Sequence, residues 1–459
     1  MDSKTAFKDV QVMLGDPKKA LLAFSLPIAV ALFVQQSNNL VDSFWVTNLG
    51  GDAMAALGLV YPIYAVLIGI GNGLGIGVAA AIARKIGMGK NEVASRIATQ
   101  SITLVIIVSI VATPILILGG EPILKLIGAG ATLATSIEYA FPLYLSTGLI
   151  IMSGVMSGIL RGEGAVRKSM YIQIVAAVIN LVLDPIFIYT LGWGVAGAAW
   201  ATTISFAASV IMGLYWYCIK KNMFLTMKWA YLRFNKACQK EILSVGFPES
   251  VEFSAMNLFN IAYNFCIITV SSTDVMGLYT VAWRIMYLLM IPAQAMGGAI
   301  VSACSAEFGM KRYDMIKQAY SYATKFSVSW LILFAVILFA AAGMVASVFT
   351  QSPDVQYLHG DMVSMLHILV WVVPFMAPIY VGSSLLQALN RSKVALVSTV
   401  IRNSVLTVFF FVAAYTVGTE SSLWWAMVSG EVFGGLLMGY WAYVVLKDSS
   451  RKDGIKISG

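Results

Sequence analysis

The stretches LAFSLPIAVALFVQQSNNLVDSF at 22–44 and ILSVGFPESVEFSAMNLFNIAYNF at 242–265 decide the fold. Each is as long as the roughly 20 mostly apolar residues with which an α-helix crosses a bilayer. The two also align with each other, and Pro27 falls opposite Pro248 at a spacing of 221 residues. The pattern therefore predicts two similar halves, each beginning with a membrane-spanning helix.

The composition of the whole chain agrees with a membrane location. Hydrophobic residues make up 59% of its 459 residues, and charged residues make up only 11%. A soluble domain cannot cover so much apolar surface, whereas a bilayer removes that need. We predict an all-α integral membrane protein with twelve transmembrane helices. The predicted spans are 20–48, 53–83, 97–119, 133–158, 166–190, 193–218, 243–270, 276–304, 318–349, 361–386, 394–417 and 421–446.

Lysine and arginine gather on one side of these spans. The N-terminus, the connections that follow even-numbered spans and the C-terminal tail are basic. The opposite side carries Lys125 and acids such as Asp52, Asp354 and Glu420. The positive-inside rule then predicts a multi-pass plasma-membrane protein with both termini in the cytoplasm. The net charge of +8 could suggest binding to nucleic acid, but no soluble domain remains that could carry a basic patch. We therefore expect no nucleic-acid partner.

The order of the spans predicts the domain organisation. Six spans separate the two copies of the repeat, so both halves keep the same orientation, as in transporters whose substrate path lies between parallel repeats. We predict an N-terminal six-helix bundle at 1–218, a C-terminal bundle at 241–446 and a cytoplasmic tail at 447–459. The connecting segment 219–240 interleaves basic and apolar residues, which is typical of an amphipathic segment at the membrane surface.

Motifs for catalysis and for ATP binding are missing from useful places. The four cysteines are scattered, and the two histidines, His359 and His367, do not stand near them, which argues against a disulfide framework and a zinc site. No HExxH or GxSxG sequence is placed where it could form an active site, and no Walker A sequence for ATP binding occurs. We expect neither an enzyme nor a cofactor. A channel would more naturally use a symmetric polar pore than the asymmetric set of acids described below.

Several short motifs, in order along nearly the whole chain, resemble those of the MATE (multidrug and toxic compound extrusion) transporters. The motifs are NNLVDSFWVTNLG at 38–50, GMGK at 87–90, RGEG at 161–164, NLVLDPIFIY at 180–189, GWGVAGAAWAT at 192–202, and the pair Gln387 and Arg402. The resemblance implies two pseudo-symmetric six-helix bundles that form a V-shaped cleft. Two such bundles in one chain would allow a monomer to work. The resemblance also implies secondary-active export of amphipathic or cationic compounds in exchange for H⁺ or Na⁺.

The resemblance further implies a coupling site in the N-terminal bundle. The matching positions are Asp42, Asn180, Asp184 and Thr202, with Tyr139 as a neighbour, and the same four would hold a Na⁺ ion. Depth agrees with this assignment, since Asp42 and Asp184 each lie about six residues, or about 9 Å, from the outer end of an outward-running helix. Two nearby carboxylates in hydrocarbon cannot both ionise at low cost, which suits proton exchange.

Other polar residues within the spans are candidates for the substrate cleft. They are Gln35, Asn38 and Asn39 in the first span, Asn257 and Asn260 in the seventh, and Arg284 in the eighth. The second half lacks the acids of the first, because the repeat aligns Asp42 with Tyr263. We therefore expect coupling in the first half only.

The remaining intramembrane charges leave one alternative open. Glu431 in the last span could pair with Arg284, while Glu249 and Glu252 are expected to face cytoplasmic water. In the RGEG turn, Arg161 and Glu163 are expected to serve gating or packing. A flippase for a lipid-linked saccharide would favour a cationic cleft, for which Arg284, Lys325 and Arg402 are the candidates.

Overall fold

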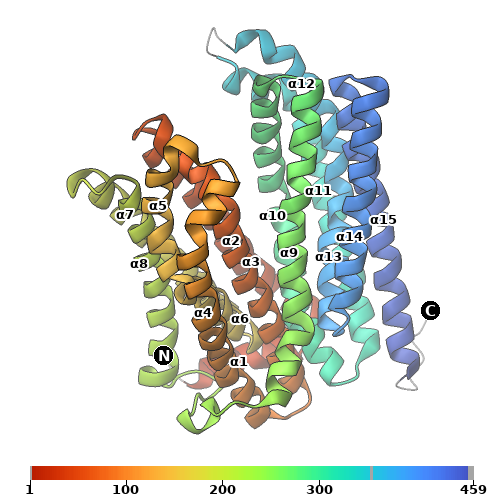
Figure 1. Ribbon diagram of the computed structural model, residues 1–459. Helices are drawn as coiled ribbons and strands as arrows, with labels where there is room; N and C mark the ends of the chain where they lie inside the picture. Colours follow the sequence, from red (N-terminus) through yellow and green to blue (C-terminus); the bar gives the residue numbers. More distant parts are fainter. Residues whose placement is uncertain (1–2, 352–354, 453–459) are drawn as a thin grey trace. The chain divides into compact units, whose positions relative to one another are not determined.

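The computed structural model describes residues 3–351 and 355–452, and within these ranges it contains helices and no strand (Figure 1). Asp354 and residues 453–459 of the predicted tail lie outside the described residues. The α-helices are α1 (Ser3–Leu14), α2 (Pro17–Thr47), α3 (Gly51–Gly87), α4 (Asn91–Leu126), α5 (Leu133–Leu145), α6 (Thr147–Gly162), α7 (Val166–Pro185), α8 (Gly194–Leu214), α9 (Lys236–Val270), α10 (Thr273–Gly309), α11 (Tyr313–Phe349), α12 (His359–Leu369), α13 (Val373–Ala388), α14 (Ser392–Val412) and α15 (Glu420–Lys452). Short 3₁₀ or π segments are η1 (Gly130–Thr132), η2 (Ile186–Thr190), η3 (Tyr215–Lys220), η4 (Trp229–Leu232), η5 (Gln356–Leu358), η6 (Val370–Val372) and η7 (Ala413–Val417).

The predicted spans coincide with these helices. Ten helical stretches are long and apolar enough to cross a bilayer, and the bent pair α5–α6 supplies an eleventh. The twelfth predicted span lies in α15, whose 33 residues also suffice to cross a bilayer. The prediction of an all-α membrane protein is therefore confirmed.

The fourth span is bent rather than straight. Its two halves, α5 and α6, meet at an angle of 50° around Ser146. Pro142 removes one backbone hydrogen bond of α5, and the hydroxyls of Ser146 and Thr147 donate to the carbonyls of Leu143 and Tyr144. Such side-chain bonds back to the preceding turn bend helices. The sequence pattern predicted the span but not this bend.

The internal repeat is visible in the way two helices end. The fifth span of the first half, α7, widens after Pro185 into the π-helical turn η2. The fifth span of the second half, α14, widens in the same way into η7. A π-helical turn is rare and often marks a functional position, so its recurrence at equivalent places supports the repeat read from the sequence.

The described chain belongs to two compact units. Unit 1 takes Met1–Ala20, Val30–Ser254 and Ser305–Met310, and unit 2 takes Leu21–Ala29, Ala255–Cys304 and Lys311–Gly459. The start of α9 belongs to unit 1 because it packs closely on α3: a Cβ atom added at Gly77 would lie 2.6 Å from the Gly246 nitrogen. The segment 219–240 is thus part of unit 1, and the predicted bundle boundaries stay a prediction.

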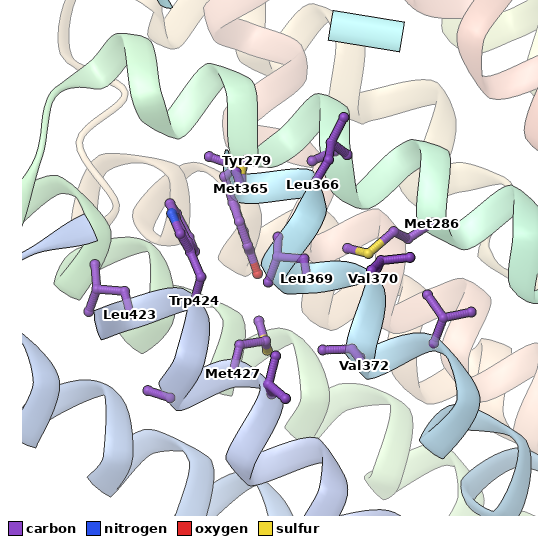
Figure 2. Close-up of a cluster of buried hydrophobic side chains, with 14 of the residues drawn as sticks. Tyr279, Met286, Met365, Leu366, Leu369, Val370, Val372, Leu423, Trp424 and Met427 are labelled. Carbon is purple, nitrogen blue, oxygen red and sulfur yellow. The ribbon is translucent and has the colours of Figure 1, made fainter. Parts of the chain in front are cut away.

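Unit 2 has a core rich in methionine and aromatic side chains (Figure 2). Tyr279 of α10 stacks on Trp424 of α15 with ring centroids 5.5 Å apart. Met286, Met365 and Met427 are buried around this pair. Because methionine is flexible and polarisable, it fills irregular gaps between helices.

Candidate functional site

A chain of side-chain hydrogen bonds joins α2 to α7 within unit 1. The Asn38 amide nitrogen donates to both Asp42 carboxylate oxygens, at 3.3 and 3.2 Å, and to the Asn180 carbonyl oxygen at 2.6 Å. The Asn180 amide nitrogen then donates to Asp184 Oδ1 at 3.1 Å. Asp42 and Asp184, which the sequence placed at one depth, therefore belong to one connected set of four polar residues, which we call the carboxylate cluster: Asn38, Asp42, Asn180 and Asp184.

The two acids of the carboxylate cluster meet each other. Asp184 is 1% exposed, and no donor of the described residues reaches its Oδ2 atom. Its carboxyl group and that of Asp42 are close enough to share a hydrogen bond. Two ionised carboxylates have no donor to offer, so such a bond needs a proton on one of them, and a cation between them would hold them together in its place. The arrangement is chemically suited to holding one positive charge.

The local sequence explains how the site is presented. Asn38 and Asp42 are four residues apart on α2, and Asn180 and Asp184 are four apart on α7, so each pair lies on one helix face. Pro185 ends the regular α-helix directly after Asp184, and η2 follows. The carboxylate of Asp184 therefore lies at a break in the backbone hydrogen bonds, where polar groups are tolerated within a span.

The two remaining predicted coupling residues differ in their surroundings. Tyr139 of α5 packs against two apolar clusters of unit 1 and lies within electrostatic reach of both Asp42 and Asp184. The Thr202 hydroxyl donates to the Ala198 carbonyl of its own helix, α8, at 3.0 Å. Tyr139 thus lies beside the carboxylate cluster, and Thr202 has a backbone partner in its own helix.

The residues predicted for the substrate cleft are spread over several environments. Gln35, Asn39, Asn260 and Arg284 are exposed, Asn257 is half-buried, and Asn38 belongs to the carboxylate cluster. The Asn39 amide nitrogen donates to Gln36 of the same helix at 3.2 Å. Of the cleft candidates in the first span, Asn38 therefore links α2 to another helix, while Asn39 bonds within α2.

Unit 2 has a polar cluster of its own at the corresponding helices. The Tyr263 hydroxyl of α9 donates to Asn403 Oδ1 of α14 at 3.0 Å. Beside Asn403, the buried Arg402 pairs with the buried Glu431 of α15, with its Nη1 atom 3.2 Å from Glu431 Oε2. The predicted partner of Glu431, Arg284, was wrong, because sequence depth does not show which helix faces point at each other.

Two more acids differ from the sequence expectation. Glu252 is buried instead of facing water, while Glu249 is half-buried. Glu163, expected in a cytoplasmic turn with a role in gating or packing, is 1% exposed and accepts hydrogen bonds from the Tyr217 hydroxyl at 2.8 Å and from the Leu225 nitrogen at 2.9 Å. Its burial raises the pKa of the Glu163 carboxyl to about 7, although these two hydrogen bonds act in the opposite direction.

Comparison with known proteins identifies the family. The MatE family model matches residues 27–186 and 248–412, which is more than half of the chain. The chain belongs to the MatE family. It is a membrane protein built like the transporters of that family, and the resemblance inferred from the motifs is confirmed.

Similar proteins cover different shares of this MatE chain. It is 24% identical to the multidrug export protein MepA of Staphylococcus haemolyticus over 92% of both chains. It is 28% identical to MepA of Staphylococcus saprophyticus over 250 residues, where the match spans about half of each protein, 54% of this chain and 55% of the relative. A crystal structure of a MATE protein in complex with MaL6 is 30% identical, with a TM-score of 0.93, over 97% of this chain and 99% of that one.

Proposed function

We propose that this MatE protein is a secondary-active multidrug exporter that moves amphipathic or cationic compounds in exchange for H⁺ or Na⁺. Its coupling site is the carboxylate cluster, with Tyr139 and Thr202 as neighbours. The observation that carries the proposal is the buried Asp184 Oδ2 atom, which no donor in the described part of the chain reaches while its carboxyl group meets that of Asp42. Placing ionisable groups within a membrane span costs free energy, so such a site indicates a function.

A proton and a Na⁺ ion would use this site differently. A proton would bridge the two carboxyl groups and would need no further ligand. A Na⁺ ion would take oxygens from Asp42, Asn180 and Asp184, and the Thr202 hydroxyl oxygen could join them while its hydrogen stays on the Ala198 carbonyl. The Thr202 bond therefore does not distinguish the two ions, because the hydroxyl donates its hydrogen and keeps its lone pairs.

The names of the relatives support the substrate class. Two similar proteins are named multidrug export proteins. The match to the Staphylococcus haemolyticus protein includes both halves of the chain. We propose the same task for this chain, carried out by alternating access between bundles at 1–218 and 241–446. The bias of lysine and arginine supports a plasma-membrane protein with cytoplasmic termini, and the two complete repeats allow a monomer to work alone.

A flippase for a lipid-linked saccharide is the alternative, and the Arg402–Glu431 ion pair of unit 2 argues against it. Such a substrate carries phosphate and would need free cationic side chains in the cleft. Arg402, one of three candidates, is already paired with Glu431 and buried. This leaves the exposed Arg284 and Lys325 as cationic candidates, and we propose cationic or neutral amphiphiles as the substrates.

A binding experiment tests the proposal before any transport is measured. An antiporter binds substrate and coupling ion in competition, so each must weaken the binding of the other by the same factor. We would measure the Kd of tetraphenylphosphonium for the purified protein over a series of pH values and Na⁺ concentrations. Wild type should bind more weakly as one of the two ions increases, and Asp184→Asn should bind with a Kd that no longer depends on that ion.

The control is Asp52→Asn, which removes an exposed acid from the start of α3 in the same unit. This variant should keep the ion dependence of wild type. If Asp184→Asn kept the full ion dependence as well, the carboxylate cluster would not be the coupling site. Absence of tetraphenylphosphonium binding to wild type, with binding of a phosphate-bearing amphiphile instead, would favour the flippase.

A further inference from the structure

The segment between α8 and α9 carries a dense positive charge. Residues 219–240 contain six lysine or arginine residues and no acid. Lys220, Lys221, Lys228 and Arg233 are all exposed. Cations this close repel one another, and an anionic surface beside them would lower that repulsion.

The segment is nevertheless held in one conformation by α4. The side chain of Gln100, which is fully buried, donates to the carbonyls of Tyr231 and Arg233, the latter at 2.8 Å, and accepts from the Asn235 nitrogen at 3.0 Å. Thr103 donates to the Leu232 carbonyl at 3.1 Å. The backbone around η4 is therefore hydrogen-bonded to side chains of α4, and this part of the segment is not a flexible linker.

The attachment to α4 fixes the depth of the segment. Thr103 lies three residues before Ile106, about one helical turn. From Ile106 onward α4 exposes large apolar side chains, among them Ile110 and Val111, as a helix does where it faces lipid tails. The turn η4 therefore lies at the level where α4 enters the hydrocarbon, which is the headgroup level of the bilayer.

At this level the segment exposes large apolar side chains beside its cations. Trp229 is 89% exposed, Ile219 is 71% exposed and Phe234 is 59% exposed. Figure 1 shows the connection between α8 and α9 at the end of unit 1 where α4 begins. Tryptophan is enriched at membrane interfaces because its ring is amphipathic, and lysine is attracted there by anionic lipids.

We propose that residues 219–236 form a binding site for anionic phospholipid headgroups on the basic side of the membrane. Lys220, Lys221, Lys228 and Arg233 bind the headgroup phosphates, and Trp229 and Phe234 insert among the upper parts of the acyl chains. Charge complementarity selects the occupant: a lipid surface offers negative charge and apolar contact at the same depth. The carboxylate cluster takes no part in this site.

Lipid retention tests the charged half of the proposal. The full-length protein would be purified in mild detergent with a mixture of phosphatidylglycerol and phosphatidylcholine, and the lipid that stays bound would be counted by native mass spectrometry. Wild type should retain phosphatidylglycerol in preference. The triple variant Lys220→Gln/Lys221→Gln/Lys228→Gln should retain several-fold less of it, and its phosphatidylcholine should not change.

A charge-matched control separates a site from overall charge. Lys18→Gln/Lys19→Gln/Lys447→Gln removes the same number of positive charges from other places on the basic side. This control should retain phosphatidylglycerol as wild type does. Equal loss in both triple variants, or loss in neither, would overturn the proposal.

Fluorescence quenching tests the apolar half without relying on the lysine variants. The emission of Trp229 is obtained as the difference between wild type and Trp229→Phe, both reconstituted in phosphatidylglycerol-containing bilayers. Lipids brominated near the top of the acyl chain should quench this difference signal, whereas iodide in the aqueous phase should not. Quenching by iodide alone would show that Trp229 faces water and would overturn the proposal.

Discussion

The Asn38 amide nitrogen of α2 lies 2.6 Å from the Asn180 carbonyl oxygen of α7, and this hydrogen bond joins the two acids of the carboxylate cluster through amides. Asn180 uses its oxygen for Asn38 and its nitrogen for Asp184. Asn38 in turn donates to Asp42. A change of charge at one acid therefore alters the hydrogen bonding of the other helix, which is what a coupling site requires.

Replacing Asn38 should uncouple the site. Asn38→Leu removes a donor to a carboxylate, and such bonds contribute about 1.5–3 kcal/mol. We expect gradient-driven efflux of tetraphenylphosphonium from proteoliposomes to fall about tenfold or more, since about 1.4 kcal/mol changes a rate or an equilibrium tenfold. Asn39→Leu, at the next position and with a partner on its own helix, should keep nearly full activity. Equal activity of both variants would argue against the role of Asn38.

Breaking the Arg402–Glu431 pair should destabilise unit 2. Both side chains are buried, so Glu431→Leu leaves an uncompensated guanidinium and should cost about 3–5 kcal/mol. The double variant Arg402→Met/Glu431→Leu removes both charges and should recover most of that loss. The Tm of the detergent-solubilised variants measures the difference. A double variant as unstable as the sum of the two single variants would show that the pair is not the main interaction of either residue.

Glu163 should make stability depend on pH. Its burial raises its pKa from the usual 4.5 to about 7, so the folded protein binds the proton more tightly than the unfolded chain. This contribution is complete below pH 4.5 and is lost as the pH rises through about 7. The Tm of wild type should therefore decrease over this range relative to that of Glu163→Gln.

The groups that face Glu163 define the control for this pH experiment. They are Tyr217, the Leu225 nitrogen, Lys168 and Asp9. Burial also raises the pKa of Asp9, so Asp9→Asn is measured in parallel to remove its share. Identical pH profiles of wild type and Glu163→Gln would contradict the assignment.

Close packing of α3 on α6 depends on glycine. A Cβ atom at Gly154 would lie 2.6 Å from the Gly71 carbonyl oxygen, so the backbones have to move apart. Gly154→Ala should lower stability by about 1–3 kcal/mol, as overpacking does. Gly58→Ala, in α3 with no atom near the added Cβ, should be neutral or stabilise by up to about 1 kcal/mol. A thermal unfolding series compares the two, and equal Tm values would refute the packing argument.

The positions of the helices and the depth of the acids could be predicted from the sequence, whereas most of the side-chain partners of the acids could not. Hydropathy and charge placed the spans because a bilayer demands long apolar helices and lysine or arginine on one side. Depth placed Asp42 and Asp184 in one layer, and the structure joins them through Asn38 and Asn180. The spacing of four residues between Asn38 and Asp42 is visible in the sequence, whereas the bond from Asn38 to Asn180 is seen only in the structure.

Contacts between distant helices could not be predicted from the sequence. Glu431 pairs with Arg402 and not with Arg284, because the rotation of each helix about its axis is set by packing of the whole unit. Glu163 is buried under Tyr217 and the Leu225 backbone, although its motif resembles an exposed turn. The bend at Ser146 follows from hydroxyl groups that bond to backbone carbonyls, and such bonds leave no periodic signal.

The most direct test of the coupling site is tetraphenylphosphonium efflux from proteoliposomes under an imposed pH gradient or an imposed Na⁺ gradient. Wild type, Asp42→Asn, Asp184→Asn and the control Asp52→Asn would be compared at equal amounts of reconstituted protein. The account predicts that one of the two gradients drives efflux in wild type and in Asp52→Asn, and that both cluster variants lose it while they still bind the probe. Full gradient-driven efflux in Asp42→Asn and Asp184→Asn would contradict the account.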